Sequence, residues 1–118
     1  MATPNIVNVA TINAKNAAAK LTGTSRTEAI DVPADKVAKV NTILVANVDG
    51  TNAADISVSI YDGSTDRYIA KVISVPAKAT QILCAKDTYF YLEEGDSIRA
   101  VASVASDLEL VIGYEDIS

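Results

Sequence analysis

Apolar and polar residues alternate along most of the chain with a period of two, and turn residues interrupt the alternation. The segment 56–61 reads Ile-Ser-Val-Ser-Ile-Tyr, and the segment 107–112 reads Asp-Leu-Glu-Leu-Val-Ile. Because successive side chains of a β-strand point to opposite faces, such segments bury one face and expose the other. Asp-Gly pairs at 49–50 and 62–63 and the Glu-Gly-Asp at 94–96 supply turns between them. This punctuation is typical of a β-sandwich or barrel.

The alternation predicts strands near residues 5–12, 24–32, 37–48, 55–62, 67–75, 79–85, 88–92, 96–103 and 107–115. The segment 13–20 contains three consecutive alanines, but it has no apolar stripe, so we interpret it as a strand extension or an arm instead of a helix. The predicted fold class is all-β: an antiparallel two-sheet β-sandwich, jelly-roll-like, with almost no helix. Its interior is expected to contain Val45, Val58, Ile60, Val72, Phe90, Ile98 and Leu110.

The first 23 residues differ from the rest, so we divide the chain into an N-terminal arm or added strand, 1–23, and a β-sandwich domain, 24–118. The sizeable aliphatic side chains of the arm are few: Ile6, Val7, Val9, Ile12 and Leu21. They cannot form a core of their own. We expect the arm to be ordered by adding a strand to a neighbouring copy or to a binding partner, the alternative being a flexible terminus.

The composition of the chain argues against several classes of function but identifies none. The 118 residues contain 49% hydrophobic residues but no His and no Trp. His is the commonest general base near neutral pH and a common metal ligand, and we therefore expect no enzyme, no cofactor and no metal site. The single Cys84 follows the apolar Ile82 and Leu83, which predicts a small buried side chain and not a reactive thiol.

Charge excludes two classes of partner. The formal net charge is −5, and the ten Lys and Arg residues are scattered singly, without the basic stripe that nucleic acid requires. The chain also lacks an apolar run of the ~18–20 residues that a membrane helix needs. We therefore expect a soluble chain without an export signal, which binds neither nucleic acid nor membranes.

Acidic loops and one carboxylate pair are the remaining candidates for chemistry. The loops at 49–55 and 62–66 lack the ordered carboxylate spacing of an EF-hand, so we interpret both as turns. Glu93 and Glu94 are consecutive, and consecutive strand residues point to opposite faces. They therefore cannot share a proton or flank a glycosidic bond.

Two tyrosines are the most informative side chains for binding. In the segment 88–92, Tyr89 and Tyr91 fall on one face of the predicted strand and Phe90 falls on the other. The two tyrosines either belong to a second core layer or are exposed anchors at a protein interface, where Tyr is enriched. We select Tyr89 and Tyr91 as interface candidates, together with Ile6, Val7 and Val9 of the arm.

Three short motifs in a fixed order carry a resemblance to a known group of proteins. They are Val45-Ala46-Asn47 before a turn, Val75-Pro76-Ala77 at a corner and Leu92-Glu93-Glu94-Gly95-Asp96 before a strand of small residues. In their order and spacing, residues 24–118 resemble small β-sandwich virion proteins of tailed bacteriophages, especially phages of marine and cyanobacterial hosts.

The resemblance implies a structural role without catalysis. The group is similar both to capsid decoration proteins and to tail or neck components, and its pattern does not separate these roles. Our first expectation is a capsid decoration (cement) protein on the outer capsid surface. The alternative is a tail, neck or fibre-associated protein, and a carbohydrate-binding β-sandwich module ranks third. The implied partners are the major capsid protein or other virion proteins. The implied location is the virion, at the capsid surface or the tail, after assembly in the host cytoplasm. A homo-oligomer is expected, with a trimer as first choice and a dimer as second.

Overall fold

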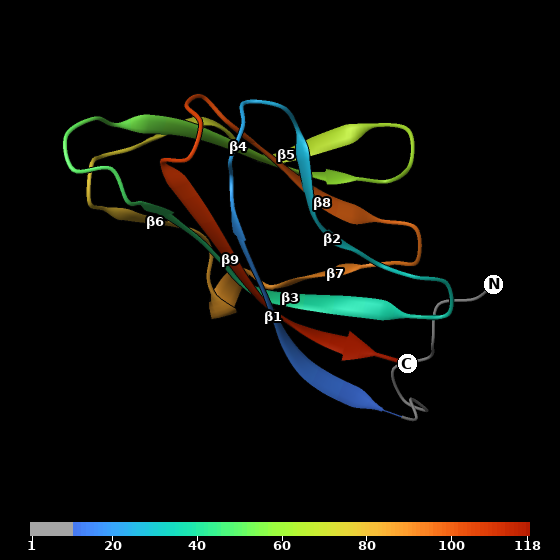
Figure 1. The fold of residues 1–118 in the computed structure, drawn as a ribbon. Helices are drawn as coiled ribbons and strands as arrows, with labels where there is room; N and C mark the ends of the chain where they lie inside the picture. The colour runs from blue at the N-terminus through green and yellow to red at the C-terminus, as the bar shows by residue number, and fades with distance from the viewer. Residues whose placement is uncertain (1–10) are drawn as a thin grey trace.

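The computed structural model describes residues 11–118, and in this range the regular secondary structure is almost entirely β-strand (Figure 1). The strands are β1 (Ile12–Lys20), β2 (Thr27–Asp31), β3 (Val37–Asn47), β4 (Ala54–Tyr61), β5 (Asp66–Val75), β6 (Thr80–Cys84), β7 (Phe90–Leu92), β8 (Ser97–Ala102) and β9 (Leu108–Ile117). One short 3-10 turn, η2 (Lys86–Thr88), precedes β7. The predicted all-β class is confirmed.

The strands form two antiparallel sheets that pack face to face. Within the described range, sheet A has the order β1-β9-β3-β6, with β7 also paired to β3, and sheet B has the order β2-β8-β4-β5. The pairs β1·β9, β2·β8, β3·β6 and β4·β5 are nested, as if one long hairpin were wound into two layers. This nesting is the arrangement of a jelly roll, which confirms the predicted topology.

The core lies between the inner faces of the two sheets. Of the seven positions expected there, Val45, Val58, Ile98 and Leu110 are at most 1% exposed. Ile60 and Phe90 are partly buried and pack against the same cluster. Alternation predicted these positions because each strand has one face turned to the other sheet and one to solvent.

Val72 is the exception, and its predicted burial is wrong. Its side chain is 62% exposed, and its φ is +51°. Ile73 pairs with Ile56 while Ala70 pairs with Val58, so β5 has one residue more than β4 across this interval. A β-bulge of this kind shifts the alternation by one position and turns a side chain outward. The Val72 N–H donates to the Ser57 hydroxyl, 2.9 Å away, instead of to a ladder carbonyl.

The described part of the arm is a strand of the chain's own sheet. β1 pairs with β9 in continuous register from Ile12↔Ile117 to Lys20↔Glu109, and the two strands run side by side in Figure 1. Leu21, which follows β1, is 2% exposed and belongs to the core cluster. The arm therefore adds a strand within this chain over residues 12–20. The division of the chain after residue 23 stays a prediction, and Ile6, Val7 and Val9 lie outside the described residues.

Candidate functional site

The outer face of sheet A carries an apolar row that crosses four strands. Strand register pairs Ile82 with Leu44, Leu44 with Val111, and Val111 with Ala18. Directly paired residues lie on the same side of a sheet, and Ile82 and Val111 are 59% and 38% exposed. The row therefore faces away from the core. We call it the apolar row.

A second row on the same face contains one of the predicted tyrosines. Tyr91 pairs with Lys39, Lys39 with Glu115, and Glu115 with Ala14. We call these four residues the tyrosine row. Tyr89 lies beside it, with its ring 6.0 Å from that of Tyr91 in an edge-to-face arrangement. Tyr89 and Tyr91 are 49% and 43% exposed, so they form no second core layer, and their role as interface anchors stays a prediction.

Charged and amide groups surround the tyrosines. The Lys39 ammonium lies 4.4 Å from the centre of the Tyr89 ring and 3.9 Å from a Glu115 carboxylate oxygen. The Asn41 amide donates to the same carboxylate oxygen over 3.1 Å. These groups line a surface hollow of about 320 Å³ beside Tyr89, and Lys86 contributes to its rim. Tyrosine is a side chain that is enriched at protein interfaces, so Tyr89 and Tyr91 are the groups of this site most typical of a contact surface.

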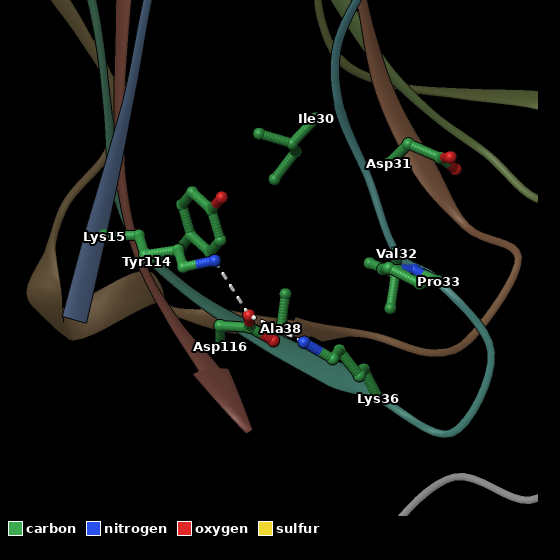
Figure 2. A pocket seen from close by; sticks show the side chains of 9 residues that line it. All are labelled: Lys15, Ile30, Asp31, Val32, Pro33, Lys36, Ala38, Tyr114 and Asp116. Carbon is green, nitrogen blue, oxygen red and sulfur yellow. Dashed lines mark hydrogen bonds and ion pairs between the residues drawn. The ribbon is translucent and has the colours of Figure 1, made fainter. Parts of the chain in front are cut away.

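A smaller hollow opens between the two sheets, and Figure 2 shows how its polar groups meet. It measures about 130 Å³. Asp116 of β9 lies between Lys15 of β1 and Lys36, at 3.1 Å and 3.4 Å from their ammonium nitrogens. Burial acts to raise the pKa of Asp116, but hydrogen bonds from the two lysines hold the pKa below its ordinary value. This carboxylate therefore links the edge strand β1 to the body of the molecule.

The outer face of sheet B contains a charge network that sequence reasoning did not find. Asp66 binds Arg26 at 2.9 Å and accepts from the Ser59 hydroxyl at 2.9 Å, and Arg99 lies 3.7 Å away. Arg99 also stacks on Tyr61, with its guanidinium carbon 4.1 Å from the ring centre. Arg26 and Asp66 are 40 positions apart in the chain, so no local spacing could reveal the network. The alternation does put Ser59 and Tyr61 on the outer face, and this is the only part of the network that the sequence pattern indicates.

The other predicted residues have local structural roles. Cys84 is 2% exposed, which confirms its predicted burial. Asp49 and Asp62 cap their own turns, and hydrogen bonds from the N–H groups of Asn52 and Thr65 respectively are the largest causes lowering their pKa values. Across residues 11–118, no three His, Cys, Asp or Glu side chains gather as a metal site would require. The same range contains no helix long and apolar enough to span a membrane.

Comparison with known proteins identifies a fold and no family. No family model matches the chain, and no curated protein matches it. Among solved structures, it is similar to a chain in the acidic stable capsid structure of Helicobacter pylori bacteriophage KHP30. The TM-score is 0.57 over 94% of this chain and 90% of that chain, at 14% sequence identity. At this identity the likeness shows that the two chains share a fold.

Proposed function

We propose that this chain is a non-enzymatic structural protein of a bacteriophage virion, and specifically a capsid decoration protein that binds the outer capsid surface. The observation that carries the proposal is the match to a chain of a phage capsid structure over nearly the full length of both chains. The three sequence motifs by which the chain resembles small phage virion proteins support the same class.

The proposed activity is binding by contact area. Exposed large apolar side chains lie on the outer surfaces of both sheets: Ile82, Tyr89, Tyr91 and Val111 on sheet A, and Tyr68 and Val72 on sheet B. Rigid aromatic and aliphatic side chains bury large area at a small loss of side-chain entropy. Repetition of such contacts over a capsid lattice raises the effective concentration of each copy, so a weak single contact suffices for retention.

The N-terminal arm contributes a second attachment in this proposal. Residues 12–20 belong to the chain's own sheet, so this part of the proposal is confined to Ile6, Val7 and Val9, which lie outside the described residues. A chain that lacks residues 1–10 retains β1 and is expected to fold normally but to dissociate from capsids more readily. Normal retention of this truncated chain would remove the arm from the proposal.

A carbohydrate-binding role is the weaker alternative. Exposed Tyr89 and a hollow lined by Asn41 and Glu115 offer groups that sugars use. However, Lys39 lies over the Tyr89 ring, and Glu115 already accepts a hydrogen bond from Asn41. The Lys39 ammonium therefore covers a face of the Tyr89 ring on which a sugar would stack. Selective signal on a glycan array would reverse this preference.

The proposal is tested by co-sedimentation of the purified full-length chain with particles of the phage that encodes it. Heads and tails are separated first, and particles depleted of the native protein are used. Saturable binding to heads is the expected result. Binding to tails would favour the tail, neck or fibre alternative, and binding to neither would overturn the proposal.

A further inference from the structure

We propose that the outer face of sheet A packs against the same face of a second copy, which makes the chain a two-fold homodimer. The proposal goes beyond the virion role, because it is argued only from the residues on this face of the sheet. It therefore applies to the isolated protein in solution. The two-fold axis runs parallel to the strands, between β3 and β9. It places β3 of one copy over β9 of the other, and β6 and β7 over β1.

The tyrosine row is complementary to itself under this axis. Its order is Tyr91, Lys39, Glu115, Ala14, from β7 to β1. A second copy presents the same row in reverse, so each Lys39 faces a Glu115 and each Tyr91 faces an Ala14. Large side chains therefore meet small ones, and positive groups meet negative ones. In an isologous interface such reciprocal contacts each occur twice.

The apolar row is complementary in the same way. Its order is Ile82, Leu44, Val111, Ala18. The two-fold axis brings Ile82 over Ala18 and Leu44 over Val111, again large over small at the margins. Between the two rows lie Thr42 and Gly113, and a Cβ on Gly113 would come within 2.8 Å of the Thr42 hydroxyl. Because Gly113 has no side chain, the surface between the two rows does not protrude at this position.

The available area is sufficient for a stable dimer. β3, β9 and β1 have 11, 10 and 9 residues. At a rise of ~3.3 Å per residue and a strand spacing of ~4.8 Å, a four-stranded face projects ~600 Å² per copy. The two copies together therefore bury a projected area of ~1,200 Å², and the uneven surface of the side chains adds to this value. The total reaches the size of specific protein–protein interfaces. Packed sheets align within ~30° of each other, so the central rows stay opposed despite the twist.

The opposite surface of the molecule is a poorer candidate. On the outer face of sheet B, Asp66 is already paired with Arg26 and lies near Arg99. The Asp66–Arg26 contact is 2.9 Å, whereas Lys39 and Glu115 of sheet A are 3.9 Å apart, so a partner would have to desolvate a tighter ion-pair network on sheet B than on sheet A. A three-fold assembly would join two different patches, whereas the reversed rows of sheet A match one patch to itself. The face therefore favours a dimer over the trimer expected first from the sequence.

Sedimentation equilibrium of the full-length chain gives the first test. The expected mass is twice 12.4 kDa. Val111→Lys places two like charges near the axis and is expected to weaken dimerisation by at least ~100-fold. Val72→Lys is the matched control, because Val72 is exposed on the other sheet, and it should leave the dimer intact. A monomeric wild type, a trimer, or equal loss in both variants would overturn the proposal.

Charge reversal gives a second test that folding defects cannot imitate. Lys39→Glu opposes two carboxylates across the interface, and Glu115→Lys opposes two ammonium groups, so each variant alone should be monomeric. Mixed together, the two variants should form a heterodimer, because a carboxylate of the first then faces an ammonium group of the second at both reciprocal positions. The internal pair between positions 39 and 115 stays like-charged in both variants, so it cannot explain a rescue. Failure of the mixture to dimerise would contradict the proposed axis.

Discussion

Replacement of Asn47 by alanine tests how the sandwich holds the turn that follows β3. The Asn47 side chain is 2% exposed. Its amide nitrogen donates to the carbonyls of Val75 and Asn52, at 2.9 Å and 3.0 Å, and its oxygen accepts from the Asp49 N–H at 2.9 Å. One side chain therefore ties the 48–53 turn to the end of β5. We expect Asn47→Ala to release this connection and to destabilise the whole fold.

The magnitude of this loss follows from the three hydrogen bonds. Each contributes a net ~0.5–1.5 kcal/mol, and the buried Val75 carbonyl left without its partner adds to the penalty. Two of the bonds lie partly exposed, where water replaces the lost partner. We therefore expect the free energy of unfolding to fall by ~2–4 kcal/mol. For a chain of this size, that corresponds to a melting temperature lower by ~8–16 °C.

Urea denaturation at fixed protein concentration measures the change, with thermal unfolding as a second readout. Asn52→Ala is the matched control, because the Asn52 side chain donates to the exposed Thr51 hydroxyl at 3.2 Å. The control should change the free energy of unfolding by less than ~0.5 kcal/mol. A loss below ~1 kcal/mol for Asn47→Ala, or an equal loss in the control, would refute the reasoning.

Three further predictions concern pH, backbone strain and metal ions. Lysine contacts lower the pKa of Asp116 in the folded chain, so their stabilisation is present above the ordinary value of 3.8 and is lost as the pH falls through the lower folded pKa. The melting temperature of Asp116→Asn should therefore lie below that of the wild type at neutral pH and converge with it in acid; a constant difference would contradict this. Val72 has a φ of +51°, which asparagine tolerates better than a β-branched residue does. We therefore expect Val72→Asn to raise the free energy of unfolding by ~0.5–1 kcal/mol. A lower free energy of unfolding in urea denaturation would contradict the proposed backbone strain. EDTA should leave the melting temperature unchanged, because Asp49 and Asp62 bind their own turns; a large decrease would show that these loops bind a cation.

Most strands could be predicted from the sequence because the period of two reflects one buried and one exposed face. Val58, which lies between Ser57 and Ser59, follows this rule and is fully buried. Val72 does not, because the bulge that turns it outward depends on how β5 pairs with β4, and this pairing leaves no mark in local alternation. The segment 12–20 was ambiguous for a different reason. Its alanines provide little contrast between faces, and its register is set by the partner strand β9.

The candidate site was predicted in part. Alternation put Tyr89 and Tyr91 on one face, but it could not distinguish a second core layer from solvent, because that depends on what covers sheet A. The rows that combine Tyr91 with Lys39 and Glu115 join β7, β3 and β9, which are distant in sequence. Only the strand order brings these residues together, and the same holds for the network around Asp66.

Quantitative mass spectrometry of purified particles tests most directly whether this jelly roll is a structural protein of a phage head. Heads are separated from tails, and the molar ratio of this chain to the major capsid protein is measured in each fraction. We expect the chain in the heads, in many copies and at a fixed ratio to the capsid protein, as a lattice-binding protein requires. Absence from the particles, or presence in the tail fraction alone, would contradict a capsid decoration role.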